Sequence, residues 1–479
     1  MKARLQEVLE LLREQGVDHA DIRVSELQEE EIRTDNGQVS NISSTYSKGY
    51  GIRVYLDGAM GFAAAQDFDQ MPAVALRALE IAKASRLVQE QPMRLAPKPV
   101  IVDNYTTPVE IDPFTVSLEE KLALLFAAEK AMREAEPQLF KAVGNLVFQK
   151  ESKIYADTEG SYITQTLFES GGGIEAVAVN GDIVQTRTYP NSRGNFQTAG
   201  YEYVLAMELV ENAPRIAHEA VALAKAEPCP AGIYDLLIDS AQLTLQIHES
   251  IGHPIELDRV CGHEAAFFGT SFLRPEMIGF VYGSKHVNVV ADATAPGGLG
   301  TYGYDDEGVP AQCTPIITEG KFMGFLTSRD TASQLGQTSS GASRASKWGR
   351  TPIVRMTNIN LLPGDKTVDE LIGSIDYGFY LQGNKSWSID DQRLNFQFGC
   401  EIAYEIRDGK LTGKIYRDPV YTGVTPQFWR SCDGVASKEF WQMFGTRACG
   451  KAEPEQTIHV GHGSAPALFR NVKVGVNHD

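Results

Sequence analysis

The stretch "LTLQIHESIGHPIELDR", residues 243–259, decides the fold of the second half of the chain and the chemistry it can support. It places His248, Glu249 and His253 in the order H-E-x-x-x-H. This is one residue longer than the H-E-x-x-H motif, in which two histidines on one helical face bind a metal. Apolar residues at helical spacing run through the stretch, and Ser240 is the expected N-cap. The sequence therefore predicts a helix that starts near Ser240, turns Leu243, Ile247 and Ile251 inward and carries the motif.

The backbone must absorb the extra residue if both histidines are to reach one ion. On an ideal helix, residues five apart differ by about 140° in direction, so His248 and His253 would point to nearly opposite sides. Gly252 permits unusual dihedral angles, and Pro254 disfavours the α conformation at His253, so a broken helix is one solution. A π-bulge, whose bonds run from residue i to residue i+5, is the other. Either solution brings the two imidazoles to one face.

The motif offers a general base but not a complete ligand set. Glu249 would take a proton from water during attack on a peptide carbonyl and pass it to the leaving nitrogen. The alternative is an incidental glutamate beside two histidines that bind no metal. A catalytic zinc ion usually has three protein ligands and one open position. The pattern alone does not choose the third ligand among Glu256, Asp258, Cys261, His263, His286, Cys400, Cys432, Cys449, His459 and His462.

Composition narrows the class of protein. The 479 residues exceed one ordinary core, so two or three domains are expected. The net charge is −18, without a basic tail, which argues against binding to nucleic acid. The 6 cysteines are scattered, as in proteins of reducing compartments. The chain lacks a long apolar run for a membrane helix, and the amphipathic helix expected at residues 1–16 differs from a signal peptide, so we expect a cytoplasmic protein.

The order of segments predicts an α+β fold with two domains, each with antiparallel or mixed sheets and flanking helices. Residues 20–65 and 139–204 have strand alternation with glycine and asparagine turns, so we expect two antiparallel meanders. Helical periodicity is found at residues 68–87, 117–135 and 207–226. The two prolines of "EPCPAG" favour a border near residue 228. We therefore predict an N-terminal α+β domain at 1–228 and a C-terminal domain at 229–479, with the metal motif on a helix of the latter.

Three other segments invite an interpretation. The acids of "YDDEG", residues 304–308, are expected in a solvated loop, and "ASRASKWGR", residues 342–350, reads equally well as a surface loop or a binding loop. The hydroxyl groups of Tyr302 and Tyr304 are candidates for stabilising an oxyanion. The aromatic residues of the strand around 387–398 are expected in the core or in a cleft wall: Trp387, Phe396 and Phe398.

Several longer segments resemble one family. They are "GYGIRVYLDGAMGFAAA", "HESIGHPIELDR", "YDDEGVPAQCTPIITEGKFMGFLTSRDTA", "MTNINLLPGD" and "RACGKAEPEQTIHVGHGSAP". Together they resemble the TldD/PmbA family of bacterial and archaeal peptide-processing metalloproteases. TldD-type members carry H-E-x-x-x-H and a distant cysteine in C-G-K, whereas the PmbA paralogues, also called TldE, lack the motif. The chain is similar to the TldD type.

The resemblance implies a specific site. His248, His253 and Cys449 would be the ligands of a Zn²⁺ ion and Glu249 the general base, while His459 and His462 stand where the family has residues that do not bind the metal. A mixed set of two imidazoles and a thiolate suits zinc.

The resemblance also implies partners. The subunit would form a homodimer, or a heterodimer with a PmbA/TldE-like paralogue, around a chamber to which the N-terminal domain contributes. The chamber would admit unfolded or short peptides. The competing interpretation is a catalytically inactive scaffold or regulatory subunit of a peptidase complex. Neither the natural substrate nor the choice between endopeptidase and exopeptidase action follows from the sequence.

Overall fold

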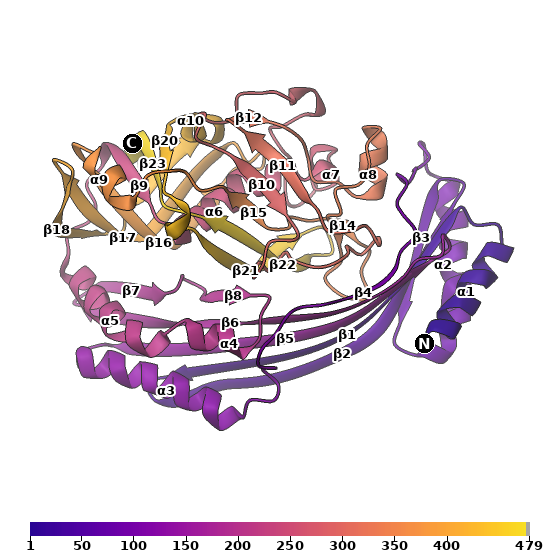
Figure 1. Ribbon diagram of the computed structural model, residues 1–479, viewed down its shortest axis with the longest axis horizontal. Helices are drawn as coiled ribbons and strands as arrows, with labels where there is room; N and C mark the ends of the chain where they lie inside the picture. Colours follow the sequence, from indigo (N-terminus) through magenta and orange to yellow (C-terminus); the bar gives the residue numbers. More distant parts are fainter. Residues whose placement is uncertain (476–479) are drawn as a thin grey trace.

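Long antiparallel strands build the first half of the chain, and the structure, a computed structural model, describes residues 1–475. Eight strands form one sheet in the order β3-β2-β1-β5-β6-β4, with β7 and β8 also paired to β6. The bounds are β1 (His19–Asp35), β2 (Gln38–Leu56), β3 (Ala59–Ala65), β4 (Val102–Thr106), β5 (Lys141–Asp157), β6 (Tyr162–Asn180), β7 (Ile183–Tyr189) and β8 (Asn195–Gln197). The two expected meanders therefore join, through the β1–β5 pairing, into a single curved sheet (Figure 1).

Helices cover one face of this sheet. They are α1 (Lys2–Glu14), η1 (Phe68–Gln70), α2 (Met71–Arg86), α3 (Leu118–Ala135), α4 (Tyr201–Ala206) and α5 (Leu209–Lys225). In β1, Ile22 and Ile32 lie in the two apolar cores under these helices. Residues at odd positions, such as Asp21 and Arg23, are polar and buried against the second half of the chain. Since side chains alternate along a strand, β1 separates an apolar face from a polar one.

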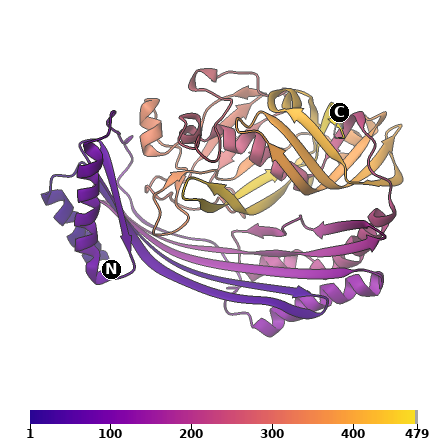
Figure 2. The ribbon, with the colours of Figure 1, turned by 180° about the vertical axis from the view of Figure 1, so that it is seen from behind.

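The second half lies over the polar face of the sheet, as Figures 1 and 2 show from opposite sides. Its largest sheet has the order β16-β9-β23-β19-β17-β18, and β16 also pairs with β17, so five strands close on themselves. A β21–β22 hairpin lies between this sheet and the long strands (Figure 1). The predicted α+β fold class is confirmed.

The elements of the second half are short apart from the strands of the closed sheet. The strands of that sheet are β9 (Gly232–Ile238), β16 (Tyr377–Ile389), β17 (Asn395–Arg407), β18 (Lys410–Arg417), β19 (Val420–Val424), β20 (Cys432–Val435) and β23 (Ala467–Val474). The other strands are β10 (Val289–Asp292), β11 (Cys313–Thr318), β12 (Lys321–Phe322), β13 (Ser343–Arg344), β14 (Ile353–Val354), β15 (Ile359–Leu361), β21 (Gln442–Lys451) and β22 (Gln456–Ser464). The helices are α6 (Ser240–Ile247), η2 (His248–Gly252), η3 (His253–Ile255), α7 (Leu257–Val260), η4 (Pro275–Met277), α8 (Arg329–Gln334), α9 (Val368–Gly373), α10 (Thr425–Arg430) and η5 (Lys438–Phe440).

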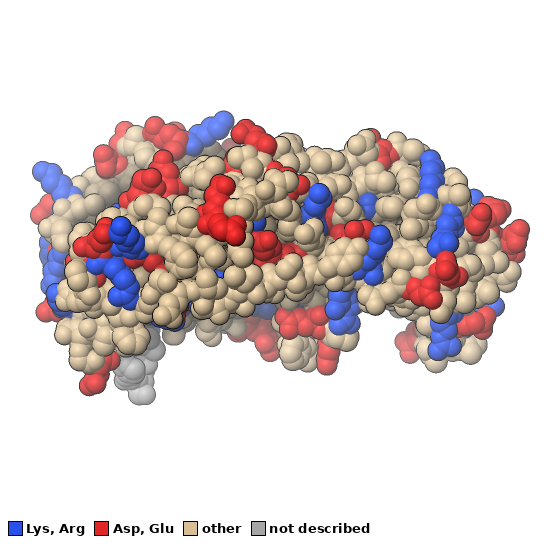
Figure 3. Space-filling view, turned by 90° about the horizontal axis from the view of Figure 1, so that it is seen from below, with Lys and Arg blue, Asp and Glu red and all other residues tan. Residues whose placement is uncertain are grey.

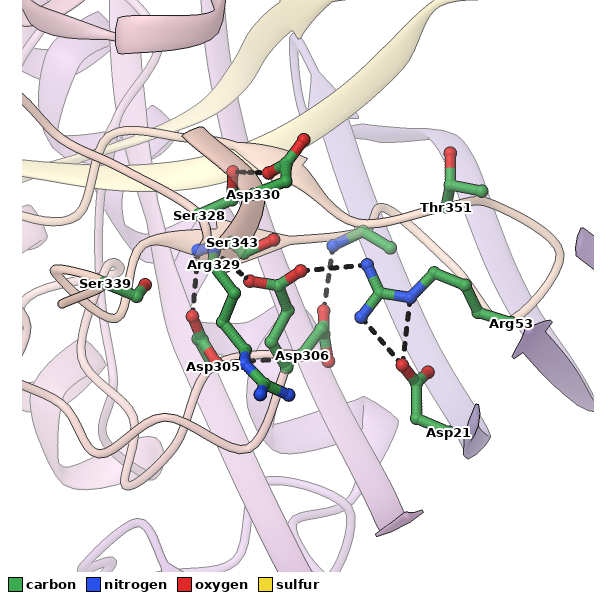
Figure 4. Close-up of polar contacts among 12 residues, drawn as sticks. Asp21, Arg53, Asp305, Asp306, Ser328, Arg329, Asp330, Ser339, Ser343 and Thr351 are labelled. Atoms are coloured by element: carbon green, nitrogen blue, oxygen red, sulfur yellow. Dashed lines mark hydrogen bonds and ion pairs between the residues drawn. The ribbon is translucent and has the colours of Figure 1, made fainter. Parts of the chain in front are cut away.

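The loop "YDDEG" is buried between the two halves, so the expectation of a solvated loop is wrong. Asp305, Asp306 and Glu307 are at most 3% exposed. Figure 4 shows this region, where Arg53 of β2 donates hydrogen bonds to Asp21 at 2.8 and 2.9 Å. Arg53 also donates to Glu307 at 2.9 Å, and Lys153 of β5 pairs with Asp306 at 2.7 Å. We call these five residues the ionic cluster: Asp21, Arg53, Lys153, Asp306 and Glu307.

Opposite charges explain why the acids tolerate burial. Burial alone raises the pKa of Asp306, but Lys153 and Arg23 reverse the effect and lower it overall. The same balance, with Arg53 as the main cation, lowers the pKa of Asp21. The loop at 342–350 also joins the two halves, since Trp348 donates a hydrogen bond to the Ser47 hydroxyl at 3.0 Å.

The surface of the described residues is mixed in charge on the face seen from below. Figure 3 shows acidic and basic side chains interspersed across it. No helix within residues 1–475 is both long and apolar enough to cross a membrane.

Candidate metal centre

The helix of the opening motif changes its winding at the first histidine. α6 starts at Ser240, and the cap is Asp239 rather than the expected Ser240, because the Asp239 carboxylate accepts a hydrogen bond from the Gln242 N–H at 2.8 Å. From His248 to Gly252 the helix has π geometry, and the N–H of His253 donates to the carbonyl of His248, five residues earlier. The π-bulge is therefore the way in which the extra residue is absorbed.

The alternative of a broken helix is wrong. His253 keeps helical dihedrals, with φ −66° and ψ −41°, and starts a short 3-10 turn. Pro254 lies in the first turn of that helix, where its missing N–H leaves no hydrogen bond unmade. Gly252 is also helical, with φ −59° and ψ −56°, so its special dihedral freedom is not used. It is needed for a close approach instead, because a Cβ at Gly252 would lie 2.1 Å from the sulfur of Met356.

The bulge turns both histidines towards a cysteine that is 196 residues further along the chain than His253. The possible ligand atoms of His248, His253 and Cys449 all lie within 4.8 Å of one another. Cys449 is in β21, and its sulfur is 4.0 Å from Nε2 of His253. All three side chains are buried, and we call them the ligand cluster.

A carboxylate behind His253 fixes the orientation of that ring. Nδ1 of His253 is 2.9 Å from the carboxylate of Glu256, which itself lies 3.4 Å from both Arg259 and Lys451. Burial raises the pKa of Glu256, but Lys451 and Arg259 outweigh it and lower the pKa overall. The ionised Glu256 accepts the Nδ1–H of His253, so the Nε2 that faces Cys449 carries a lone pair.

His248 has a different neighbour. Its Nδ1 lies 2.8 Å from Nε2 of His462, a fully buried residue of β22. Burial lowers the pKa of His248 and, more strongly, that of His253, so both rings are neutral in the neutral pH range. For Cys449, burial raises the pKa, but Arg355 and His253 outweigh it and lower the pKa below that of a free thiol.

These properties fit a metal cation. Two neutral imidazoles and a thiol of lowered pKa converge, and their hydrogen-bond partners lie behind the rings. Nitrogen and sulfur donors of this kind suit a borderline-soft divalent ion such as zinc.

A cavity of about 260 Å³ opens beside His248 and Glu249. Glu249 is 7% exposed, and its Oε2 accepts a hydrogen bond from Arg393 at 2.9 Å. The cavity is also lined by residues of the long sheet, of β16 and of the hairpin, among them Val147, Phe196, Trp387 and Arg447. Trp387 is 44% exposed, whereas Phe396 and Phe398 are buried in the core. The cleft therefore lies between the two halves of the chain, beside the ligand cluster.

The other ligand candidates lie elsewhere or are already engaged. Asp258 is 2.6 Å from Lys451. Cys261 and His263 are exposed, and Cys400 and Cys432 are buried in the apolar core. His286 is partly exposed near the surface, at the turn before β10.

The polar residues of the inter-sheet region also have partners of their own. His459 pairs with Glu169 of β6 at 2.6 Å. The Tyr302 hydroxyl donates to the Gly341 carbonyl at 2.6 Å, and the Tyr304 hydroxyl donates to Asp103.

Sequence reasoning missed two neighbours of the site. Arg393, the partner of Glu249, lies in the turn between β16 and β17, and nothing in the local pattern marks it. The sequence makes Glu256 a candidate ligand, but its position three residues after His253 also indicates a hydrogen-bonding partner on the same helical turn.

Comparison with known proteins places the whole chain in one group. Three family models match: "PmbA/TldA metallopeptidase domain 1" at residues 20–82, the "central domain" at 111–227 and the "C-terminal domain" at 231–475. A metalloprotease of Methanocaldococcus jannaschii is 30% identical over 95% of this chain and 97% of its own length. A "Zinc metalloprotease TldD homolog" of Saccharolobus solfataricus is 27% identical over 51% of this chain and 52% of its own.

Solved structures share the fold at low identity. A Thermotoga maritima protein named for modulation of a DNA gyrase has a TM-score of 0.79 at 18% identity, covering 99% of this chain and 100% of that one. TldE from Thermococcus kodakarensis has a TM-score of 0.74 at 17% identity, with the same coverage.

Proposed function

The chain belongs to the TldD/PmbA family of metallopeptidases, and on this premise we propose that it is a zinc-dependent peptidase of the catalytic, TldD type. Its substrates are unfolded or short peptides, which enter the cleft beside Glu249. The observation that carries the proposal is the convergence of His248, His253 and Cys449, the first of which lines that cleft together with Glu249. An inactive scaffold would not need these three groups together with the carboxylate.

His248, His253 and Cys449 hold the metal. Their donor set favours zinc, and a relative is named as a zinc metalloprotease. Zinc, when bound, supplies a Lewis acid that polarises a peptide carbonyl and eases the ionisation of water.

Glu249 moves the proton in this proposal. Arg393 holds its Oε2, which leaves Oε1 to accept a proton from water and to deliver it to the leaving nitrogen. The Arg393 guanidinium also keeps the carboxylate directed, so the side chain need not reorganise when the peptide enters.

The shape of the cleft favours an extended peptide. Its walls come from the long sheet, the hairpin and β16, and they include the apolar side chains of Val147, Phe196 and Trp387. Main-chain hydrogen bonds to strands supply affinity with little demand on the sequence of the peptide. A folded protein would be excluded, because its backbone cannot reach a buried ligand cluster between two layers.

The outer edge of β2 supports a dimeric assembly, either of two copies or with a PmbA/TldE-like paralogue. β3 pairs with residues 50–56 of β2 only, and residues 38–47 contain no charged side chain. Val39, Ile42 and Tyr46 of this segment are each more than 40% exposed. An uncharged, exposed strand edge is suited to pairing with another chain.

We place the protein in the cytoplasm, in keeping with its six unpaired thiols.

Two substitutions test the activity. Glu249→Gln keeps the shape of the side chain, so it should retain one zinc ion per chain but lose 10²- to 10⁴-fold in kcat, on the order expected for a lost general base. Cys449→Ser should lose both zinc and activity. Cys261→Ser, an exposed cysteine close to the motif, is the matched control and should change neither. Wild-type turnover of an unfolded peptide by Glu249→Gln would exclude the proposed role of Glu249. Full activity of metal-free Cys449→Ser would exclude the peptidase mechanism.

A further inference from the structure

His462 lies directly behind the first histidine of the motif. Its Nε2 is 2.8 Å from Nδ1 of His248, and the two rings meet edge to face with centroids 4.9 Å apart. His462 is completely buried, and its other nitrogen, Nδ1, is 3.3 Å from the carbonyl oxygen of Ile359 in β15. Both nitrogens of His462 therefore have a polar neighbour in the protein.

These neighbours determine where the protons lie. A carbonyl oxygen only accepts, so Nδ1 of His462 carries a proton and donates it to Ile359. Nε2 of the neutral ring then has a lone pair, and the 2.8 Å contact requires Nδ1 of His248 to be the donor. His248 is left with its lone pair on Nε2, the nitrogen that remains for a metal ion.

The two motif histidines are therefore oriented by different means. Behind His253 stands the Glu256 carboxylate, whereas behind His248 stands a second imidazole. His462 comes from the same hairpin as Cys449, since β22 pairs with β21 and Ile458 is opposite Cys449. Packing of this one hairpin against the helix therefore places both Cys449 and His462 next to the motif histidines.

We propose that His462 is a positioning residue, which selects the Nδ1–H tautomer of His248 and holds its ring so that Nε2 can bind the metal. This rests on the proposed role of His248 as a ligand. Groups that orient a metal-binding histidine in this way typically contribute 10- to 100-fold to metal affinity.

The experiment compares variants at two histidines of one strand. His462→Leu removes the acceptor for the Nδ1–H of His248, whereas His462→Gln keeps both an acceptor and a donor. His459→Leu is the matched control, because His459 lies three residues away on the same strand and pairs with Glu169 instead. Zinc affinity is measured by competition with a chromogenic chelator. We expect the Kd for zinc to rise about 10- to 100-fold in His462→Leu, to recover largely in His462→Gln, and to be unchanged in His459→Leu.

Two further measurements separate positioning from a general loss of structure. Nitrogen-15 NMR of the metal-free protein should find His248 as the Nδ1–H tautomer in the wild type and as a mixture in His462→Leu. The visible spectrum of the cobalt-substituted protein should change in His462→Leu and return in His462→Gln. If His462→Leu does not fold, His462→Met replaces the imidazole acceptor by a weak thioether acceptor on a more flexible side chain and should weaken zinc binding in the same direction.

The outcomes are distinct for the two proposals. Wild-type zinc affinity together with an unchanged His248 tautomer in His462→Leu would overturn the positioning role and leave the peptidase proposal standing. A wild-type protein that binds no zinc would overturn the peptidase proposal itself.

Discussion

The ionic cluster and the ligand cluster are both buried and polar, but their groups are satisfied in opposite ways. In the ionic cluster each carboxylate faces a cation of the protein. Asp21 faces Arg53 (Figure 4), and Glu307 pairs with the same guanidinium. In the ligand cluster, the groups that converge are two neutral imidazoles and a thiol, and the N–H donors of the two imidazoles point away from the centre. The first arrangement stabilises the packing of the two halves, while the second suits an added cation. Substitutions should therefore affect stability in one region and metal binding in the other.

The largest effect on stability is expected from Arg53. Arg53→Met keeps the apolar stem but removes the charge, which leaves Asp21 and Glu307 buried without their shared cation. Breaking a buried ion pair in this way costs about 3 to 5 kcal/mol in the free energy of unfolding. Urea denaturation measures the loss, and zinc content should stay at the wild-type level.

Two variants control for this result. Arg4→Met removes a cation from the exposed pair with Asp69 and should change stability by less than about 1 kcal/mol. The triple variant Arg53→Met, Asp21→Asn, Glu307→Gln removes the unpaired charges and should recover much of the loss. An Arg53→Met protein as stable as the wild type would contradict the assignment of the ionic cluster as a stabilising contact.

The ligand cluster should instead respond to added metal. As proposed, zinc binds the ligand cluster of the folded protein, so a free concentration about 100 times the Kd should stabilise the metal-free wild type by about 2.7 kcal/mol. Calorimetry with and without zinc measures this shift. His253→Ala should gain none of it, whereas His218→Ala, at an exposed histidine that pairs with Glu136, should gain as much as the wild type. An equal shift in His253→Ala would place the bound metal elsewhere.

Local features of both regions could be predicted from the sequence to different extents. The helix, its two histidines and the need for a bulge followed from the H-E-x-x-x-H spacing, because helical geometry is a property of neighbouring residues. Cys449 was one of ten candidates for the third ligand, and only the family resemblance singled it out, since no spacing rule connects it to a helix 196 residues away. The packing of Met356 against Gly252 could not be predicted either, because the two residues are far apart in the sequence.

The ionic cluster shows where sequence reasoning fails. Three consecutive acids normally indicate a solvated loop, and only the cations on β2 and β5 make burial of "YDDEG" favourable. Those strands pair with β1 on either side, so the cations converge through pairings that no local pattern specifies. The sequence also did not predict that the two meanders join into one sheet. A strand pattern indicates that a strand exists, but it does not indicate which distant strand pairs with its edge.

Gly252 tests the packing behind the ligand cluster. A methyl group there would overlap the buried Met356 sulfur, and overpacking of a core costs about 1 to 3 kcal/mol. Replacing a helical glycine by alanine gains about 1 kcal/mol, so Gly252→Ala should lose up to about 2 kcal/mol net. Gly373→Ala, in α9 with open space around the new methyl, is the control and should be neutral or stabilising. A stabilised Gly252→Ala would show that Met356 moves aside at no cost.

The smallest effect is expected at the cap of α6, and it depends on pH. Burial raises the pKa of Asp239 to about 7, although the Gln242 N–H and Arg187 oppose the rise. Between pH 4 and pH 7 the folded state therefore holds a proton that the unfolded chain, with a pKa of about 3.9, has released. The contribution of Asp239 to the free energy of unfolding is therefore fully present below about pH 4 and is lost as the pH rises through 7.

Asp239→Asn does not titrate but still accepts the capping hydrogen bond, since asparagine is as good an N-cap as aspartate. Its free energy of unfolding should vary less with pH than that of the wild type, by about 1 to 2 kcal/mol between pH 5 and pH 8, because the carboxyl group is only partly desolvated. Denaturation at a series of pH values measures the two slopes. Parallel slopes would mean that Asp239 is ionised throughout this range, so that the cap of α6 carries a full charge in the same way as the acids of the ionic cluster.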